Sequence, residues 1–208
     1  VVEVAPDPTQ SVKKKSKILI YVASTLLILT FFLPLWSIEL EAPQYPEGIG
    51  LEIWINQITG QKPNDLENIN GLNHYIGMKR IEPDDIAELK IMPFIIGFMI
   101  LFGFVSAFIG KRYLVYTWII TFIILGAVGL YDFYLWEYDY GHNLNPQAAI
   151  KIPGMAYQPP LIGSKMLLNF NAISMPHISF YILVVAVILA AFALIIDKKN
   201  KEKSFGKI

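Results

Sequence analysis

The chain has 208 residues, of which 54% are hydrophobic, and it carries 17 basic and 17 acidic side chains. The hydrophobic fraction exceeds the roughly 45–50% of an ordinary globular domain, and the excess is concentrated in blocks. The lack of cysteine excludes disulfides, thiolate metal sites and a cysteine nucleophile. A formal net charge of zero gives no indication of a nucleic-acid partner, and none is expected.

The first block is a candidate membrane-spanning helix over residues 18–36. It follows a tail, residues 1–17, that holds four lysines. A basic start before an apolar run is also typical of a signal peptide. This run, however, is close to the ~20 residues needed to span a bilayer and has no small-x-small cleavage site. We therefore expect a retained first span.

Residues 37–91 form the longest polar segment, with ten acidic residues against four basic ones. Ser37–Glu41 alternates polar and apolar residues as a half-buried strand does, and Gly50–Ile55 nearly does so again. The Pro and Gly residues between these stretches predict a turn, so we expect a small antiparallel sheet. Further on, Glu82–Asp85 places Pro and acidic residues where they favour the first turn of a short helix.

The second and third spans are predicted over residues 92–110 and 114–136, joined by a turn of three residues, 111–113. So short a connection predicts an antiparallel helical hairpin. Small residues in both helices allow their backbones to approach closely in lipid, and helix packing is enough to explain them. These small residues are Gly97, Gly103, Ala107, Gly126, Ala127 and Gly129.

The third span continues into an aromatic and acidic stretch, Tyr131–His142, without a Gly or Pro that would end the helix before residue 141. Four Tyr and one Trp within its first ten residues indicate a membrane–water boundary, because their rings are apolar and their polar tips seek hydrogen bonds. A second polar segment, residues 137–177, leads to the fourth predicted span, 178–196. The tail, 197–208, carries five lysines.

The distribution of basic residues predicts the orientation. Eleven of the 17 lie in the two tails and the turn at 111–113, and only six lie in the two long loops. Because cytoplasmic segments are enriched in Lys and Arg, we expect a multi-pass protein of the cytoplasmic membrane with both termini inside. The expected fold class is an all-α integral membrane protein with four transmembrane helices and a small extracytoplasmic β-containing cap. This arrangement is similar to that of claudin-like tetraspan proteins, in topology only.

The two outer loops are expected to fold together as one cap. Ordering each residue costs roughly 1–2 kcal/mol of backbone entropy, and without disulfides that cost has to be offset by buried apolar side chains. The candidates for a shared core are Trp54, Tyr75, Trp136 and Tyr157.

All three His and four of the six Met lie in the predicted outer segments, which disfavours a haem held between helices. Copper(I) accepts imidazole and thioether ligands, and both ligand types occur close together at His74 and Met78 and again at Met175 and His177. One hypothesis is a single copper site formed by these four residues. The other is that they pack or hydrogen-bond within the folded loops. No cofactor other than copper is expected.

Asp132 is the acidic residue nearest the third span, and Asp139 follows seven residues later. If the helix continues, the two project from nearly the same face with Trp136 between them. An ionisable residue at this depth is a functional candidate, but a hydrogen bond or ion pair at the headgroup level is the favoured explanation. One Asp without an interrupted helix pair argues against transport.

Gly71–Met78 is rich in residues with special backbone or hydrogen-bonding capacity. It predicts a folded loop that presents a surface to a partner or to the second outer loop. Asn73 within it, and His142 at the end of the aromatic stretch, are candidate contact residues.

A family likeness rests on five stretches of the chain: Glu41–Pro46, Gly71–Met78, Tyr131–Trp136, Gly141–Pro146 and Pro159–Gly163. Together they resemble a family of four-span membrane proteins encoded with Sec-exported (clade II type) nitrous oxide reductase and its copper-maturation genes. The resemblance covers most of the chain. It implies an accessory function in nitrous oxide respiration, and so in denitrification, but it assigns no site residues.

Three classes of function are compatible with these patterns. The favoured one is a non-enzymatic accessory or scaffold protein in the lipid bilayer that receives a protein partner at its extracytoplasmic face. By resemblance that partner is the reductase or its maturation complex, and the role is maturation or electron supply. The second is a copper-handling protein, and the third is a subunit of a membrane electron-transfer complex. No phosphate loop or nucleophilic triad motif is present, and we expect the protein not to be an enzyme.

Overall fold

The computed structural model describes residues 10–205, and their side chains as far as residue 197. The predicted tails at residues 1–9 and 206–208 lie outside the described residues. The described chain divides into two compact units. We name residues 10–32, 94–126 and 181–205 the helical unit. Residues 33–93 and 127–180 are the sheet unit.

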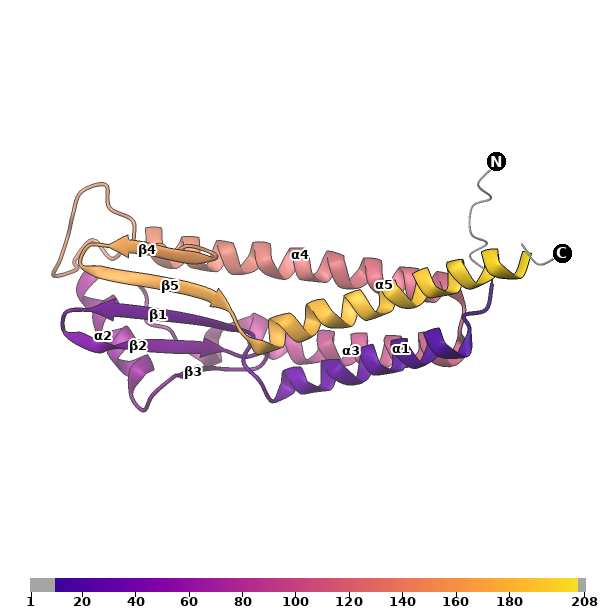
Figure 1. Cartoon of the computed structure of the whole chain (residues 1–208). Coiled ribbons are helices and arrows are strands. Elements are labelled where there is room, and N and C mark those ends of the chain that lie inside the picture. Colours follow the sequence, from indigo (N-terminus) through magenta and orange to yellow (C-terminus); the bar gives the residue numbers. More distant parts are fainter. Residues whose placement is uncertain (1–9, 206–208) are drawn as a thin grey trace. The chain divides into compact units, whose positions relative to one another are not determined.

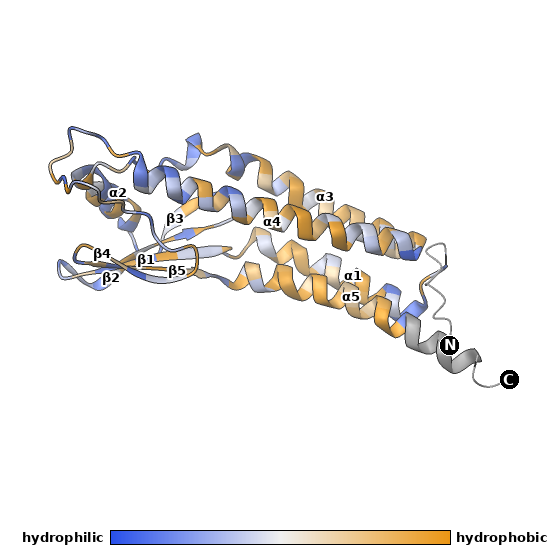
Figure 2. Ribbon diagram, turned by 90° about the horizontal axis from the view of Figure 1, so that it is seen from above, coloured by the Kyte–Doolittle hydropathy of each residue, from blue (hydrophilic) through white to orange (hydrophobic). Residues whose placement is uncertain are grey.

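Three helices in the described chain are long and apolar enough to cross a membrane. They are α3 (Ala87–Ile109), α4 (Arg112–His142) and the part of α5 (Ile178–Phe205) that runs to Asp197. Figure 2 shows the hydrophobic colour along these helices. Large apolar side chains cover their surfaces, with Phe94 and Phe108 each 78% exposed. Such surfaces fit contact with lipid, so the chain is a multi-pass membrane protein.

The predicted first span, residues 18–36, forms two short helices instead of one long one. The 13-residue α1 (Lys14–Leu26) is followed directly by a 3-10 helix, η1 (Leu27–Phe31). Trp36, the predicted last residue of the span, instead begins the first strand. The other helices also differ from the predicted ranges, because α3 begins at Ala87 and α4 continues to His142.

Small residues permit close packing in the helical unit. A Cβ atom at Gly103 of α3 would lie 2.1 Å from Oγ of Ser24 in α1 and 3.0 Å from Nε1 of Trp118 in α4. That Nε1 donates a hydrogen bond to the carbonyl of Met99 (2.8 Å), and Trp118 is fully buried. The predicted packing role is confirmed for Gly103. A Cβ at Gly97, by contrast, would meet nothing within 4 Å.

A buried ion pair connects distant parts of the helical unit. Nη2 of Arg112 lies 3.2 Å from Oδ2 of Asp197, and the two residues are 5% and 1% exposed. The second carboxylate oxygen of Asp197 accepts from the backbone N–H of Lys13 (3.0 Å) and the hydroxyl of Ser16 (3.1 Å). Both charges are therefore paired and hydrogen-bonded, which a buried pair requires. Arg112 of the predicted basic turn thus has a structural role.

The sheet unit contains a five-stranded antiparallel sheet, which confirms the predicted small sheet (Figure 1). Its strand order is β3-β2-β1-β5-β4. The central strand β1 pairs with β2 on one side and with β5 on the other, so strands from both long loops share one sheet. The strands are β1 (Trp36–Ala42), β2 (Tyr45–Ile53), β3 (Ile58–Gly60), β4 (Gly163–Leu167) and β5 (Phe170–Pro176).

Alternation along β1 gives the sheet two different faces. Trp36, Ile38 and Leu40 point to one face, which we name the inner face, where they pack with side chains of α2 (Asp65–Ile76) and α4. The ring of Trp36 lies 5.3 Å from that of Phe133 and 5.6 Å from that of Phe180. Its Nε1 donates to Oγ of Ser174 on β5 (2.8 Å).

The prediction of a loop over Gly71–Met78 is wrong, because α2 continues to Ile76. The helix ends at Gly77, whose φ of +83° is the left-handed conformation that glycine adopts easily. The N–H of Met78 then donates to the carbonyl of Asn73 (2.8 Å). After α2 an extended segment leads to a 3-10 turn, η2 (Pro83–Asp85), at the predicted short helix.

We expect Trp36→Ala to destabilise the sheet unit by about 3–5 kcal/mol, the typical cost of truncating a buried aromatic residue. Limited proteolysis of the purified protein should then cleave residues 37–91 faster than in the wild type. Trp54→Ala is the matched control, because Trp54 is only half-buried and donates to Thr59 within the β2–β3 hairpin. Equal protease sensitivity of both variants would contradict the central role of Trp36.

Candidate functional site

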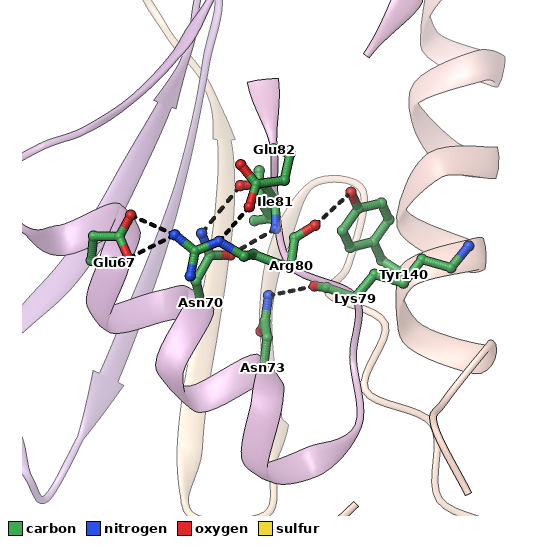
Figure 3. A network of polar contacts seen from close by, with 8 residues as sticks. All are labelled: Glu67, Asn70, Asn73, Lys79, Arg80, Ile81, Glu82 and Tyr140. Atoms are coloured by element: carbon green, nitrogen blue, oxygen red, sulfur yellow. Dashed lines mark hydrogen bonds and ion pairs between the residues drawn. The ribbon is translucent and has the colours of Figure 1, made fainter. Parts of the chain in front are cut away.

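Two side-chain amides of α2 hold the extended segment Met78–Ile81 (Figure 3). Nδ2 of Asn70 donates to the carbonyl of Ile81 (3.1 Å), and its Oδ1 accepts from the N–H of the same residue (2.7 Å). Nδ2 of Asn73 donates to the carbonyl of Lys79 (3.2 Å). The predicted contact residue Asn73 is thus 5% exposed and binds its own chain.

Arg80 lies in the same segment with its side chain at the surface. Its Nη2 contacts both carboxylate oxygens of Glu67 (2.7 and 2.8 Å), and its Nε pairs with Glu82. The hydrogen bond to Glu67, followed by that to Glu82, raises the pKa of the Arg80 guanidinium above its ordinary value. From α4, the hydroxyl of Tyr140 donates to the carbonyl of Arg80 (3.3 Å). These contacts fix the backbone that forms one wall of a pocket.

The pocket, which we name the inner pocket, lies in the sheet unit between the inner face of the sheet, α2 and α4. About 70 Å³ is accessible to the centres of water molecules, and nearly all of the lining is apolar. Aliphatic and aromatic side chains from all three sides surround this space. They include Ile38, Leu51, Ile69, Met78, Ile81 and Trp136.

Glu137 of α4 lines this pocket and is fully buried. Neither of its carboxylate oxygens has a hydrogen-bond partner among the described residues. At about 1.5 Å per residue, the 31 residues of α4 measure about 46 Å, which exceeds the roughly 30 Å of a hydrocarbon core. Glu137 belongs to the final part of α4, in the sheet unit. Burial without a partner disfavours a charged carboxylate, so the uncharged acid is the form that suits this pocket.

Tyr157 is brought against the same pocket by a close backbone contact. Its N–H donates to the carbonyl of Gly141, one helical turn after Glu137 (2.9 Å). A Cβ at Gly141 would lie 2.4 Å from the backbone nitrogen of Gln158, so glycine is needed for this approach. Tyr157 is 2% exposed, and its hydroxyl has no partner among the described residues. Two unpartnered polar groups therefore line one apolar pocket.

The predicted core and contact residues have mixed outcomes. Tyr157 is buried as predicted, and Trp136 packs against the sheet-unit core with its ring 4.3 Å from that of Tyr140. Tyr75 is 57% exposed, so its predicted place in the core is wrong. His142 is exposed and stacks on Tyr138, with ring centroids 3.9 Å apart.

The two acidic candidates both lie on α4, which continues past them as the prediction required. Oδ2 of Asp139 pairs with Nζ of Lys79 (2.5 Å), and its Oδ1 accepts from Nδ2 of Asn143 (2.7 Å). Asp132 is half-buried. Asp139 therefore makes the kind of ion pair and hydrogen bond that a structural role predicts.

The four candidate copper ligands are not brought together. His74 is exposed on α2, which packs on the inner face of the sheet, and Met78 lines the inner pocket. Met175 on β5 is paired with Ser37 on β1, and both side chains point away from this face. His177 follows β5, and its Nδ1 is buried without a partner among the described residues. Within the described chain no three His, Cys, Asp or Glu side chains are grouped to hold a metal ion. Copper binding stays a prediction.

The other face of the sheet, which we name the outer face, is acidic. Its register places three glutamates together, Glu39 and Glu41 on β1 and Glu52 on β2. Oε1 of Glu39 accepts from Gln61 (2.9 Å) and Oε2 of Glu41 accepts from Asn171 (3.0 Å), so neutral amides orient two of these carboxylates. The register of the five strands places no Lys or Arg on this face within the described residues.

A hollow of about 530 Å³ opens at the turn end of the outer face. Glu39 and Glu41 line it together with Asn171 and Glu47, and Glu47 is already paired with Nζ of Lys62 (3.9 Å). On β4 beside it, Met166 is 63% exposed. The outer face therefore combines negative charge, a concave surface and an accessible apolar side chain.

No protein-family model matches this chain, and no curated protein or solved structure matches it significantly. The fold itself shows the coarser class, a multi-pass membrane protein that also contains a five-stranded antiparallel sheet.

Sequence analysis missed Glu137, Gly141 and Tyr157 as a group. A glutamate in an aromatic helix, four residues before a glycine, is the local signal that could have drawn attention to the first two. Tyr157 was predicted as a buried core residue, but no local signal predicts that it lies beside Glu137, because its place depends on the contact with α4.

We expect Glu137→Leu to increase the thermal stability of the purified protein. Leucine fills a similar volume and removes a buried carboxyl without a partner, which typically costs about 1–3 kcal/mol. The control is Asp65→Leu, because the buried Asp65 carboxylate accepts from the N–H groups of Gly50 and Lys62 (3.0 and 3.1 Å) and should be needed for stability. A lower melting temperature for Glu137→Leu than for the wild type would show that this carboxyl stabilises the fold.

Proposed function

We propose that this chain is a non-enzymatic membrane accessory protein whose outer sheet face docks a basic segment of a partner protein. The observation that carries the proposal is the outer face itself, with Glu39, Glu41 and Glu52 on one surface. Complementary charge speeds association and selects partners. Because α2 and α4 pack on the inner face, the partner is received on the outer face.

The shape of this surface supports a protein partner over a small ion. The hollow is about 530 Å³ and is lined by Pro43, Tyr45 and Pro46 as well as by carboxylates. Exposed Met166 and Met175 (63% and 41%) add apolar contact area beside the charges. Methionine adapts its shape to different partners. An extended lysine- or arginine-containing segment fits this combination.

The proposed membrane arrangement has four spans, with both termini inside and the sheet unit at the extracytoplasmic face. The fourth span is α1 with η1. Thirteen α-helical and five 3-10 residues measure about 30 Å together, close to the hydrocarbon thickness. The orientation is supported by the eleven basic residues of the tails and the turn at 111–113.

The family resemblance suggests which partner to consider. It points to exported nitrous oxide reductase or the complex that delivers its copper, both of which act where we place the sheet unit. In this proposal the chain holds the partner at the membrane, and no catalytic step is assigned to it.

The test is binding of a fluorescent decalysine peptide to the full-length protein in lipid nanodiscs. Replacement of Glu39, Glu41 and Glu52 by Gln should weaken binding at least tenfold, and the wild-type affinity should fall as salt increases. The control carries the same charge loss on exposed residues of other elements, through Asp84→Asn, Asp85→Asn and Glu88→Gln, and should bind as the wild type does. Equal weakening of both variants would show that only net charge matters, and the proposal would fail.

A further inference from the structure

The inner pocket differs from most other buried polar positions of the sheet unit. Asp65 accepts two backbone hydrogen bonds, and Asn70 makes two bonds to Ile81. Glu137 and Tyr157, equally buried, have three polar atoms without a partner in the described chain. Buried polar groups in folded proteins are nearly always hydrogen-bonded, and each exception calls for an explanation. Nδ1 of His177 is a further exception and does not line the pocket, whereas the three atoms of Glu137 and Tyr157 belong to residues that line a space that can hold a ligand.

The chemistry of the lining selects an uncharged ligand. No Lys, Arg or His lines the pocket, so no basic group is present to neutralise the Glu137 carboxylate. A cation would have to lose its water and would find one carboxyl in mostly apolar surroundings, which is an unfavourable exchange. An uncharged carboxyl and a phenol hydroxyl are instead two hydrogen-bond donors. Each can donate to the oxygen atom of a ligand.

We propose that this pocket is a binding site for a small uncharged organic molecule with an apolar body and a single carbonyl oxygen. The oxygen accepts hydrogen bonds from the carboxyl of Glu137 and the hydroxyl of Tyr157. The apolar body contacts Ile38, Met78 and Trp136, which line the same space. This site is separate from the proposed docking surface, because it lies on the inner side of the sheet.

The size of the pocket limits the ligand. One water molecule needs about 10–15 Å³ of space measured in this way, and the pocket offers about 70 Å³. Several waters or one small ring therefore fit. Water alone is a poor occupant, because a buried water typically makes about three hydrogen bonds and only a few polar groups face the pocket.

The experiment uses full-length protein in lipid nanodiscs and cyclohexanone labelled with carbon-13 at its carbonyl. Infrared difference spectra should show a saturable carbonyl band at lower frequency than in water, because two donors in apolar surroundings polarise the C=O bond. Cyclohexane, which has the same ring without an oxygen, and cyclohexylammonium, which has the ring with a positive charge, are the comparison probes. Both should bind at least tenfold more weakly than cyclohexanone.

Conservative variants separate hydrogen bonding from packing. Tyr157→Phe and Glu137→Leu should each weaken cyclohexanone binding about tenfold and move the carbonyl band back to higher frequency, since each removes one donor. Glu137→Gln keeps a donor and should retain binding within about threefold. Glu88→Gln, at an exposed position of α3, is the control for an unrelated charge change and should behave as the wild type does.

Three results would overturn the proposal. Tighter binding of cyclohexylammonium that is lost in Glu137→Gln would identify a cation site. Equal binding of cyclohexane and cyclohexanone, unaffected by Tyr157→Phe, would identify a plain apolar cavity. Absence of any saturable band would mean that the pocket holds only water. Because Glu39, Glu41 and Glu52 are unchanged in the pocket variants, decalysine binding by these variants reports separately on the docking surface.

Discussion

The pairing of β1 with β5 is the interaction on which the sheet unit depends. It joins six residue pairs, from Trp36 with Pro176 to Glu41 with Asn171. β1 begins shortly after η1, and β5 ends two residues before α5, so each of these strands is close in the chain to a helix of the helical unit. Closing a loop of this length costs entropy, and no disulfide is available because the chain has no Cys. The buried aromatic cluster around Trp36 offsets that cost.

The strand register then determines what each face of the sheet can do. Because side chains alternate, Ile38 and Leu40 point inward while Glu39 and Glu41 point outward. The inner face becomes the core and one wall of the pocket, and the outer face becomes an acidic surface. A shift of one residue in the register would bury the glutamates and expose the core. The proposed docking surface and the inner pocket therefore depend on the same pairing.

Much of the architecture could be predicted from local patterns. Long apolar runs predicted three of the helices, and the alternation of polar and apolar residues over Ser37–Glu41 predicted β1. The strand β5 was missed because its partner β1 lies more than a hundred residues earlier in the chain, and β4 was missed with it because β4 pairs only with β5. α2 was missed because its Asn and Gly residues have low helix propensity, and packing of Ile69 on the sheet outweighs that preference.

The candidate site was harder to predict than the fold. Asn73 was recognised as a residue with hydrogen-bonding capacity, but its bond to the chain itself follows only from the position of α2. The His and Met residues are close in pairs along the sequence, and the sheet separates Met175 from the helix that carries His74. Glu137 and Tyr157 line one pocket because of a backbone contact between Tyr157 and Gly141 that no local pattern shows.

The most direct test of this account is a cysteine cross-link between β1 and β5, which is possible without first removing any native cysteine because the chain has none. Ser37 and Met175 are paired on one face of the sheet, and Cα atoms of such antiparallel pairs are about 4.5–5.5 Å apart, within the range of a disulfide. Ser37→Cys with Met175→Cys should form an intramolecular disulfide, identified by mass spectrometry of the linked peptides. Ser37→Cys with Ser174→Cys places the second thiol on the opposite face and should not. A disulfide in the second protein and none in the first would contradict the register on which both faces of the sheet depend.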